Sequence, residues 1–201
     1  MDCINRPVQP YLDSDMTSRW FDFGGDTLVR ADQFIRLTSD RASQSGWLFS
    51  RTPLSATNWE VEVEFSIHGT GNLHGDGFAM WITKDRAKPG PVFGHTDEFE
   101  GLGIFFDTYK NNRPGTVFPY VMAMMGDGKT KYDSSNDGKN NEIGGCSVSH
   151  LFRVSQADLV GSWSSTSGST HQGQIDLHPR PIPLFRAPVQ GGRCMVVMLS
   201  Y

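Results

Sequence analysis

Two loops rich in oxygen-bearing side chains are the strongest candidates for chemistry in this sequence. Residues 106–112 read Phe-Asp-Thr-Tyr-Lys-Asn-Asn and end an apolar run, and residues 132–138 read Tyr-Asp-Ser-Ser-Asn-Asp-Gly. Calcium takes about 6–8 oxygen ligands from carboxylates, amides and carbonyls, so Asp107, Asn111 and Asp137 predict a cation site if the two loops meet. Asp, Asn and Gly also dominate turns that bind nothing, which leaves an ordinary pair of turns as the alternative.

Two further acidic features each allow more than one interpretation. Asp76 stands between two glycines, which let a backbone approach a ligand closely, although a plain turn has the same pattern. Glu60, Glu62 and Glu64 alternate along one predicted strand, and retaining glycosidases place two carboxyl groups about 5–5.5 Å apart. We favour a solvated strand face over a catalytic pair, because no Asp lies between these glutamates and no aromatic subsite pattern accompanies them.

Composition and motifs argue against several functional classes. The chain has 201 residues and a net charge of −4 with dispersed Lys and Arg, so we expect one domain and no nucleic-acid partner. No apolar run approaches the ~18 residues that span a bilayer, and the N-terminus lacks the apolar core of a signal peptide. The histidines have no metal-site spacing, and a nucleophile elbow and a phosphate loop are missing, so the motifs do not indicate an enzyme.

Short strand-like runs separated by Gly, Asp, Asn and Pro must position these loops. Residues 59–67 alternate between apolar and polar types, which predicts a strand with one buried face. Residues 77–83 and 102–106 are more continuously apolar, as in strands buried on both faces, and residues 34–37 and 117–125 are further strand candidates. Without a long helical pattern, the sequence predicts an all-β sandwich.

Taken together, these segments resemble the L-type (legume-like) lectin domain of cargo receptors that cycle between the endoplasmic reticulum and the Golgi, and fungal members are the most similar. They include Gly-Asp-Gly-Phe-Ala-Met-Trp at residues 75–81 and Gly-Leu-Gly-Ile-Phe-Phe-Asp-Thr-Tyr at residues 101–109. The other matching segments are residues 19–27, 35–38, 43–51, 89–94, 132–133, 137–138 and 145–146. The resemblance implies a concanavalin-like jelly-roll β-sandwich at residues 11–147, after an unstructured leader at residues 1–10.

The resemblance also implies a set of calcium ligands. Asp107, Asn111, Asp137 and the backbone carbonyl of Tyr109 match the positions that hold Ca²⁺ in the family. The ion would fix the Asn111 loop in place, which agrees with the oxygen-rich character of both loops.

Sugar-binding positions are implied in the same way. Asp76 and Asn111 match residues that contact mannose, and Ser43 matches a weaker contact. Many animal members carry His where this chain has Ser134, which keeps a hydroxyl but loses the imidazole. Sugar affinity at the Ser134 position is therefore open.

A function in the secretory pathway follows from the resemblance alone. It implies a non-enzymatic receptor for high-mannose N-glycans on glycoprotein cargo, on the lumenal side of the endoplasmic reticulum, the intermediate compartment and the Golgi. Membrane attachment is expected only in a full-length product, and oligomers would form through a stalk outside this chain. The alternatives are a β-sandwich glycoside hydrolase that uses Glu60, Glu62 or Glu64, and a lectin-like scaffold without sugar binding.

The resemblance stops at Ser147, and residues 148–201 are predicted to be an aberrant tail. When codons are read from their second base, Met195 followed by Val must give Trp, and Met198 followed by Leu must give Cys. A Trp-x-x-Cys there fits the cysteine with which the family implies that Cys146 forms a disulfide. We therefore predict intron read-through followed by a frameshift, which leaves a poorly ordered tail that lacks this disulfide partner.

Overall fold

The computed structural model describes the backbone and side chains of residues 10–54, 65–67, 69–70 and 75–148. For residues 59–64, and for short strands beyond residue 158, it describes the backbone. The predicted leader at residues 1–10 therefore lies almost wholly outside the described residues.

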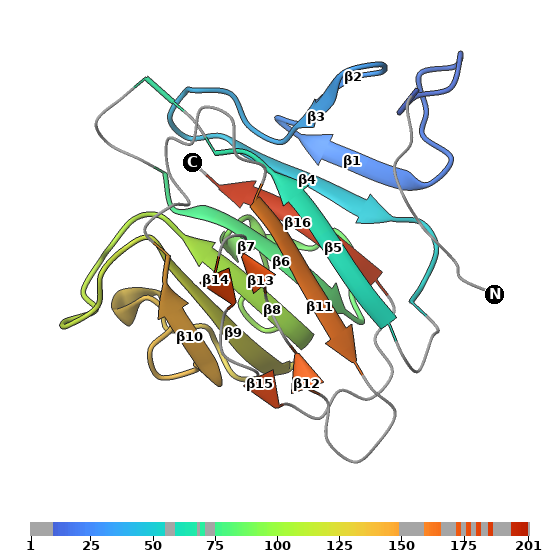
Figure 1. Cartoon of the computed structure of the whole chain (residues 1–201). Helices are drawn as coiled ribbons and strands as arrows, with labels where there is room; N and C mark the ends of the chain where they lie inside the picture. The colour runs from blue at the N-terminus through green and yellow to red at the C-terminus, as the bar shows by residue number, and fades with distance from the viewer. Residues whose placement is uncertain are drawn as a thin grey trace.

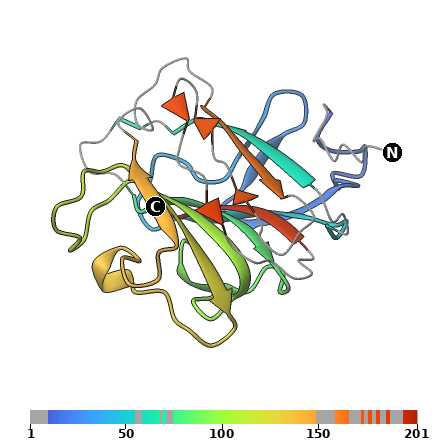
Figure 2. The same ribbon diagram turned by 60° about the horizontal axis from the view of Figure 1, so that its bottom comes forward.

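A seven-stranded antiparallel sheet forms the main layer (Figure 1). Its strands, in spatial order, are β1 (Phe21–Gly25), β4 (Ser45–Ser50), β16 (Cys194–Ser200), β6 (Gly77–Thr83), β8 (Glu100–Asp107), β9 (Tyr120–Asp127) and β10 (Gly144–Ser147). A second layer, β5 (Trp59–Phe65) paired with β11 (Leu159–Ser165), crosses one face of this sheet (Figures 1 and 2). The predicted all-β sandwich is confirmed.

The remaining elements are short. Two-residue and three-residue strands form small antiparallel pairs, and one 3₁₀ turn lies between β9 and β10. These elements are β2 (Leu28–Arg30) with β3 (Phe34–Arg36), β12 (Gln172–Gly173) with β15 (Phe185–Arg186), β13 (Asp176–Leu177) with β14 (Arg180–Pro181), the single strand β7 (Pro89–Val92) and the turn η1 (Ser134–Asn136).

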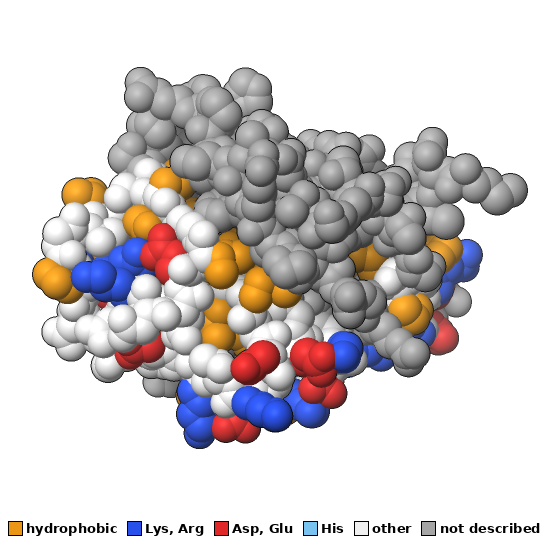
Figure 3. Space-filling model, turned by 90° about the horizontal axis from the view of Figure 1, so that it is seen from below, with side chains coloured by type: hydrophobic (Ala, Val, Ile, Leu, Met, Phe, Trp, Pro, Cys, Tyr) orange, Lys and Arg blue, Asp and Glu red, His pale blue; other side chains and the backbone are white. Residues whose placement is uncertain are grey.

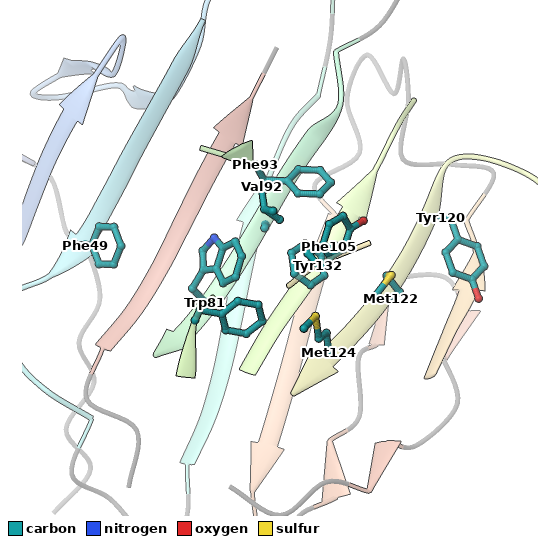
Figure 4. Close-up of a cluster of buried hydrophobic side chains, with 11 residues drawn as sticks. Phe49, Trp81, Val92, Phe93, Phe105, Tyr120, Met122, Met124 and Tyr132 are labelled. Carbon is teal, nitrogen blue, oxygen red and sulfur yellow. The ribbon is translucent and has the colours of Figure 1, made fainter. Parts of the chain in front are cut away.

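Strands β6 and β8 of the main sheet bury side chains on both faces, which explains the continuous apolar runs in the sequence. All seven residues of β6 are buried, and successive side chains alternate between two clusters. Phe78, Met80 and Ile82 lie in the cluster against which Phe65 of β5 packs. Trp81 lies in the other cluster, where it is surrounded by aromatic rings (Figure 4).

The predicted strands are confirmed with small shifts in their bounds. Residues 34–37 and 59–67 contain β3 and β5, the run at residues 77–83 is β6, and the run at residues 102–106 lies within β8. The run at residues 117–125 becomes a strand only from Tyr120, because Pro119 has no amide hydrogen for the ladder.

Backbone strands are described within the predicted aberrant tail. β11 pairs with β5 along seven residues, and β16 lies between β4 and β6 and pairs with both. The boundary at residue 147, the frameshift and the poor order of residues 148–201 stay predictions.

Charged side chains are mixed on the described surface. On the face seen from below, Lys and Arg lie interspersed with Asp and Glu (Figure 3). Ion pairs such as Lys88–Asp85, at 2.9 Å, are exposed. Among the residues with described structure, none forms a helix long and apolar enough to cross a membrane.

His95 is a buried polar residue within the aromatic cluster. Neither ring nitrogen of His95 has a hydrogen-bond partner among the described residues, and Nε1 of Trp81 also lacks one there. The Trp81 ring lies edge-on to the His95 ring, with 4.8 Å between the two ring centroids. Burial is the main cause that lowers the pKa of His95 below 6.5, while the charge of Asp85 opposes the lowering and the charge of Lys88 adds to it.

We expect His95→Phe to stabilise the protein most at mildly acidic pH. The unfolded chain protonates His95 at the ordinary pKa, whereas the folded chain keeps it neutral, so this contribution to stability is complete above about pH 6.5 and is lost as the pH falls below it. Phenylalanine has a ring of similar shape that does not titrate, so its advantage should grow by roughly 1 kcal/mol between about pH 7 and pH 5. Urea unfolding at both pH values measures this, and an equal loss in both proteins would contradict it.

Candidate functional site

Asp76 and Asp107 are neighbours because two strands place them there. Gly77 begins β6 directly opposite Asp107 at the end of β8. The Thr108 amide donates to the Asp76 carbonyl at 2.9 Å, and the Thr108 hydroxyl donates to the Gly75 carbonyl at 2.6 Å. A Cβ on Gly77, whose φ is 119°, would lie 2.0 Å from the Phe106 carbonyl oxygen, so glycine is required for this close approach.

Asp137 joins the second loop to the first. It follows η1 in a left-handed conformation, with φ 51° and ψ 46°. Its carboxylate accepts a hydrogen bond of 2.6 Å from Asn111 Nδ2, and the Asn111 amide lies 3.1 Å from both of its oxygens. Figures 1 and 2 show the β8–β9 loop and the loop with η1 on the same side of the sheet. The two oxygen-rich loops therefore meet.

Three carboxylates lie close enough to repel one another. Asp107 and Asp137 are only 4% and 2% exposed. The pKa of Asp107 is raised to about 8, mainly by burial; a hydrogen bond of 3.0 Å from the Tyr109 amide opposes the shift, and the charges of Asp137 and Asp76 add to it. Desolvation, and then the charge of Asp137, also raise the pKa of Asp76, although that residue remains exposed to solvent on one side.

The donors of this cluster fit a hard cation. The candidate ligands are the carboxylates of Asp107 and Asp137, the side-chain amide oxygen of Asn111 and the backbone carbonyl of Tyr109. All of them are oxygen ligands of the kind that Ca²⁺ takes. Asp107 and Asp137 are both buried and the charge of one acts on the other, so a bound cation would offset their repulsion. The described residues hold no cluster of three or more His, Cys, Asp or Glu arranged to bind a metal. A site here must therefore rest on mixed carboxylate, amide and carbonyl oxygens.

Ser43 and Ser134 lie on exposed turns. Ser43 has a left-handed φ of 61°, and its loop is closed by the Gln44 side chain, which accepts hydrogen bonds from both the amide and the hydroxyl of Ser39. Asp40 in the same loop accepts two hydrogen bonds from Thr70, in the segment that leads towards Asp76. Ser134 begins η1, three residues before Asp137. The sugar-binding roles of both serines stay predictions.

Side chains that the sequence did not single out support the cluster. Tyr132 is 8% exposed, and its ring centroid lies 4.9 Å from that of Phe105. A Cβ added to Gly138 would lie 2.5 Å from the Tyr132 ring, so the Gly138 backbone packs closely against that ring. Arg113 is buried and donates to the Asp137 carbonyl at 3.1 Å. Nothing in the local sequence pattern distinguishes these residues from loop or core residues.

Two features noted in the sequence lie in other parts of the chain. Cys146 on β10 is a free thiol, so the disulfide implied by the resemblance is not present, and burial is the main cause that raises its pKa. The side chains of Glu60, Glu62 and Glu64 lie outside the described part of the chain, and only their pairing with β11 is described.

Comparison with known sequences identifies the family. The model of the Legume-like lectin family matches residues 6–161. The chain belongs to the legume-like lectin family. The match begins before residue 11 and ends after residue 147, the limits that the sequence suggested.

Named relatives of this legume-like lectin are longer than the chain itself. An L-type lectin-like domain-containing protein of Schizosaccharomyces pombe is 49% identical over 140 residues, which are 69% of this chain and 45% of the relative. The VIP36-like protein of Mus musculus is 46% identical over 149 residues, which are 72% of this chain and 42% of the relative. The chain thus spans less than half the length of these relatives.

Solved structures show the same lectin fold. The VIP36 exoplasmic/lumenal domain in its Ca²⁺/Man-bound form is similar with a TM-score of 0.84 at 34% identity, covering 96% of this chain and 81% of that one. The carbohydrate recognition domain of Emp47p is similar with a TM-score of 0.73 at 15% identity, covering 95% and 84%, and it supports the fold alone. The predicted family and jelly-roll fold class are confirmed.

Proposed function

We propose that this chain binds high-mannose N-glycans on glycoprotein cargo with the help of Ca²⁺, for transport between the endoplasmic reticulum and the Golgi. The observation that carries the proposal is the meeting of Asp76, Asp107 and Asp137 with the Asn111 amide at one end of the sheet. The VIP36 domain, solved in Ca²⁺/Man, Ca²⁺/Man2 and Ca²⁺/Man3GlcNAc forms, supports the same ligand classes.

The residues of the cluster divide into two proposed roles. Asp107, Asn111, Asp137 and the Tyr109 carbonyl would hold Ca²⁺, which supplies the positive charge that their oxygens require. The Asp76 carboxylate accepts hydrogen bonds from mannose hydroxyls, and the Asn111 amide shares them. A sugar offers little apolar surface, so groups held rigid before binding must provide most of its affinity.

The wider context of the protein is part of the same proposal. We infer a non-enzymatic receptor on the lumenal side of the endoplasmic reticulum, the intermediate compartment and the Golgi, in line with relatives that include vesicular integral-membrane proteins. Membrane attachment and oligomerisation belong to segments of a full-length product. Ser43 and Ser134 would extend the sugar site.

Binding to arrayed glycans, with calcium and with a chelator, tests this function. We expect the protein to bind high-mannose glycans with calcium, to lose that binding with the chelator, and to release no sugar product. Binding that survives chelation contradicts the calcium role. Hydrolysis that disappears in Glu62→Gln would favour a glycosidase, and an absence of binding under both conditions would favour a scaffold.

A further inference from the structure

Arg113 is a buried cation in contact with Asp137 of the candidate calcium site. Arg113 is only 5% exposed. A buried charge is stable only when it is paired and hydrogen-bonded. Its guanidinium forms an ion pair with Glu142, donates from Nη1 to the Asp137 carbonyl at 3.1 Å, and donates from Nε to the Thr116 hydroxyl at 3.2 Å. A fork of five donors can make this set of contacts, whereas a single ammonium group cannot.

These contacts hold Asp137 from two sides. The Asn111 backbone amide and side chain donate to the Asp137 carboxylate, while Arg113, two residues further along the same loop, donates to the Asp137 carbonyl. The left-handed backbone of Asp137, which a non-glycine residue rarely adopts, is therefore fixed at both ends.

Arg113 and its partner Glu142 also contact Tyr120 of the main sheet. The guanidinium lies 4.1 Å from the centre of the Tyr120 ring, and the Tyr120 hydroxyl donates to Glu142 at 2.8 Å. Tyr120 begins β9, at the edge of the cluster next to β10 (Figure 4), and pairs across the ladder with Asp107. Arg113 thus connects the turn of Asp137 to the strand position beside Asp107.

We infer that Arg113 is a positioning residue for the calcium site, which it serves by fixing the separation of the Asp107 and Asp137 carboxylates. It does not touch the ion, because its charge faces Glu142 and a backbone carbonyl. The inference rests on the proposed function only in taking these two carboxylates as calcium ligands. Residues behind metal ligands typically change metal affinity by about 10- to 100-fold when they are removed.

Calcium titration of metal-free protein by calorimetry tests the inference. We expect Arg113→Met to weaken calcium binding by about 10- to 100-fold, and mannose binding to return at saturating calcium. The matched control is Lys110→Met, which removes a positive charge from the same loop; within the described part of the chain, Lys110 Nζ donates to the Thr116 carbonyl at 2.8 Å. In this control, removal of a positive charge that would repel Ca²⁺ should leave calcium binding unchanged or slightly tighter.

A second variant separates positioning from simple loss of stability. Arg113→Met with Glu142→Gln leaves no unpaired buried charge and keeps an acceptor for Tyr120, so it should fold while calcium affinity stays reduced. Hydrogen exchange supplies a readout without calcium: in both variants the Asn111 amide, which donates to Asp137, should exchange faster than in the wild type.

The outcomes distinguish this inference from the proposed function. If the wild type binds calcium and the double variant binds it equally well, with unchanged Asn111 exchange, Arg113 is only a partner for Glu142 and the inference is overturned. If the wild type itself binds no calcium, the proposed function fails, and the inference fails with it.

Discussion

Asp107→Asn should stabilise the metal-free protein and at the same time remove its calcium binding. The unfolded chain ionises Asp107 at its ordinary pKa, whereas burial and two neighbouring carboxylates raise the folded pKa to about 8. The folded state is therefore penalised increasingly as the pH rises from about 4, and the penalty is complete above about pH 8. A neutral amide of the same shape removes it.

The stability gain should be roughly 2–4 kcal/mol at about pH 8 and close to zero at about pH 4, which allows for relaxation around the buried carboxylate. Chemical unfolding of both proteins in chelator measures it. Asp127→Asn is the matched control, because hydrogen bonds to Thr130 and Lys129 lower the pKa of that exposed carboxyl to about 2, and its neutralisation should not stabilise. A similar gain in both variants, or none in Asp107→Asn, would contradict the electrostatic cause.

Asp76→Asn should separate sugar binding from calcium binding. Asp76 lies beside the proposed ligands but is not one of them, so calcium affinity should change little. Loss of a charged hydrogen-bond acceptor costs about 1.5–3 kcal/mol, which corresponds to a fall of about 10- to 100-fold in mannose affinity. Calorimetric titrations with calcium and then with mannose give both values.

Asp137→Asn is the comparison for that experiment, because it should weaken calcium and mannose binding together. An Asp76→Asn protein that loses calcium would place Asp76 among the ligands. One that keeps full mannose affinity would remove Asp76 from the sugar site. Either result would require a different division of roles within the cluster.

Much of the fold could be predicted because β6 and β8 are buried on both faces. Strands of that kind read as continuous apolar runs, and the loops that follow them hold polar residues at the sheet edge. The same logic placed Asp107 and Asn111 at a sheet edge, whereas their meeting with Asp137 followed from the family resemblance. Residues 195–199 form another apolar run, and this pattern could have indicated β16, which lies between β4 and β6.

The support beneath the site could not be predicted in this way. Arg113 and Glu142 are 29 residues apart, and only the closing of two loops onto β9 brings them together. Tyr120 looks like one more apolar strand residue in the sequence, yet its hydroxyl binds Glu142 and its ring lies under Arg113. Contacts between distant loops leave no periodic pattern along the chain.

A crystal structure of this chain with calcium and a mannose disaccharide tests the central claim most directly. We expect one ion about 2.3–2.6 Å from oxygens of Asp107, Asn111, Asp137 and the Tyr109 carbonyl, with mannose hydroxyls against Asp76 and Asn111. An ion bound elsewhere, or a sugar that occupies another surface while these three carboxylates stay free, would contradict the account.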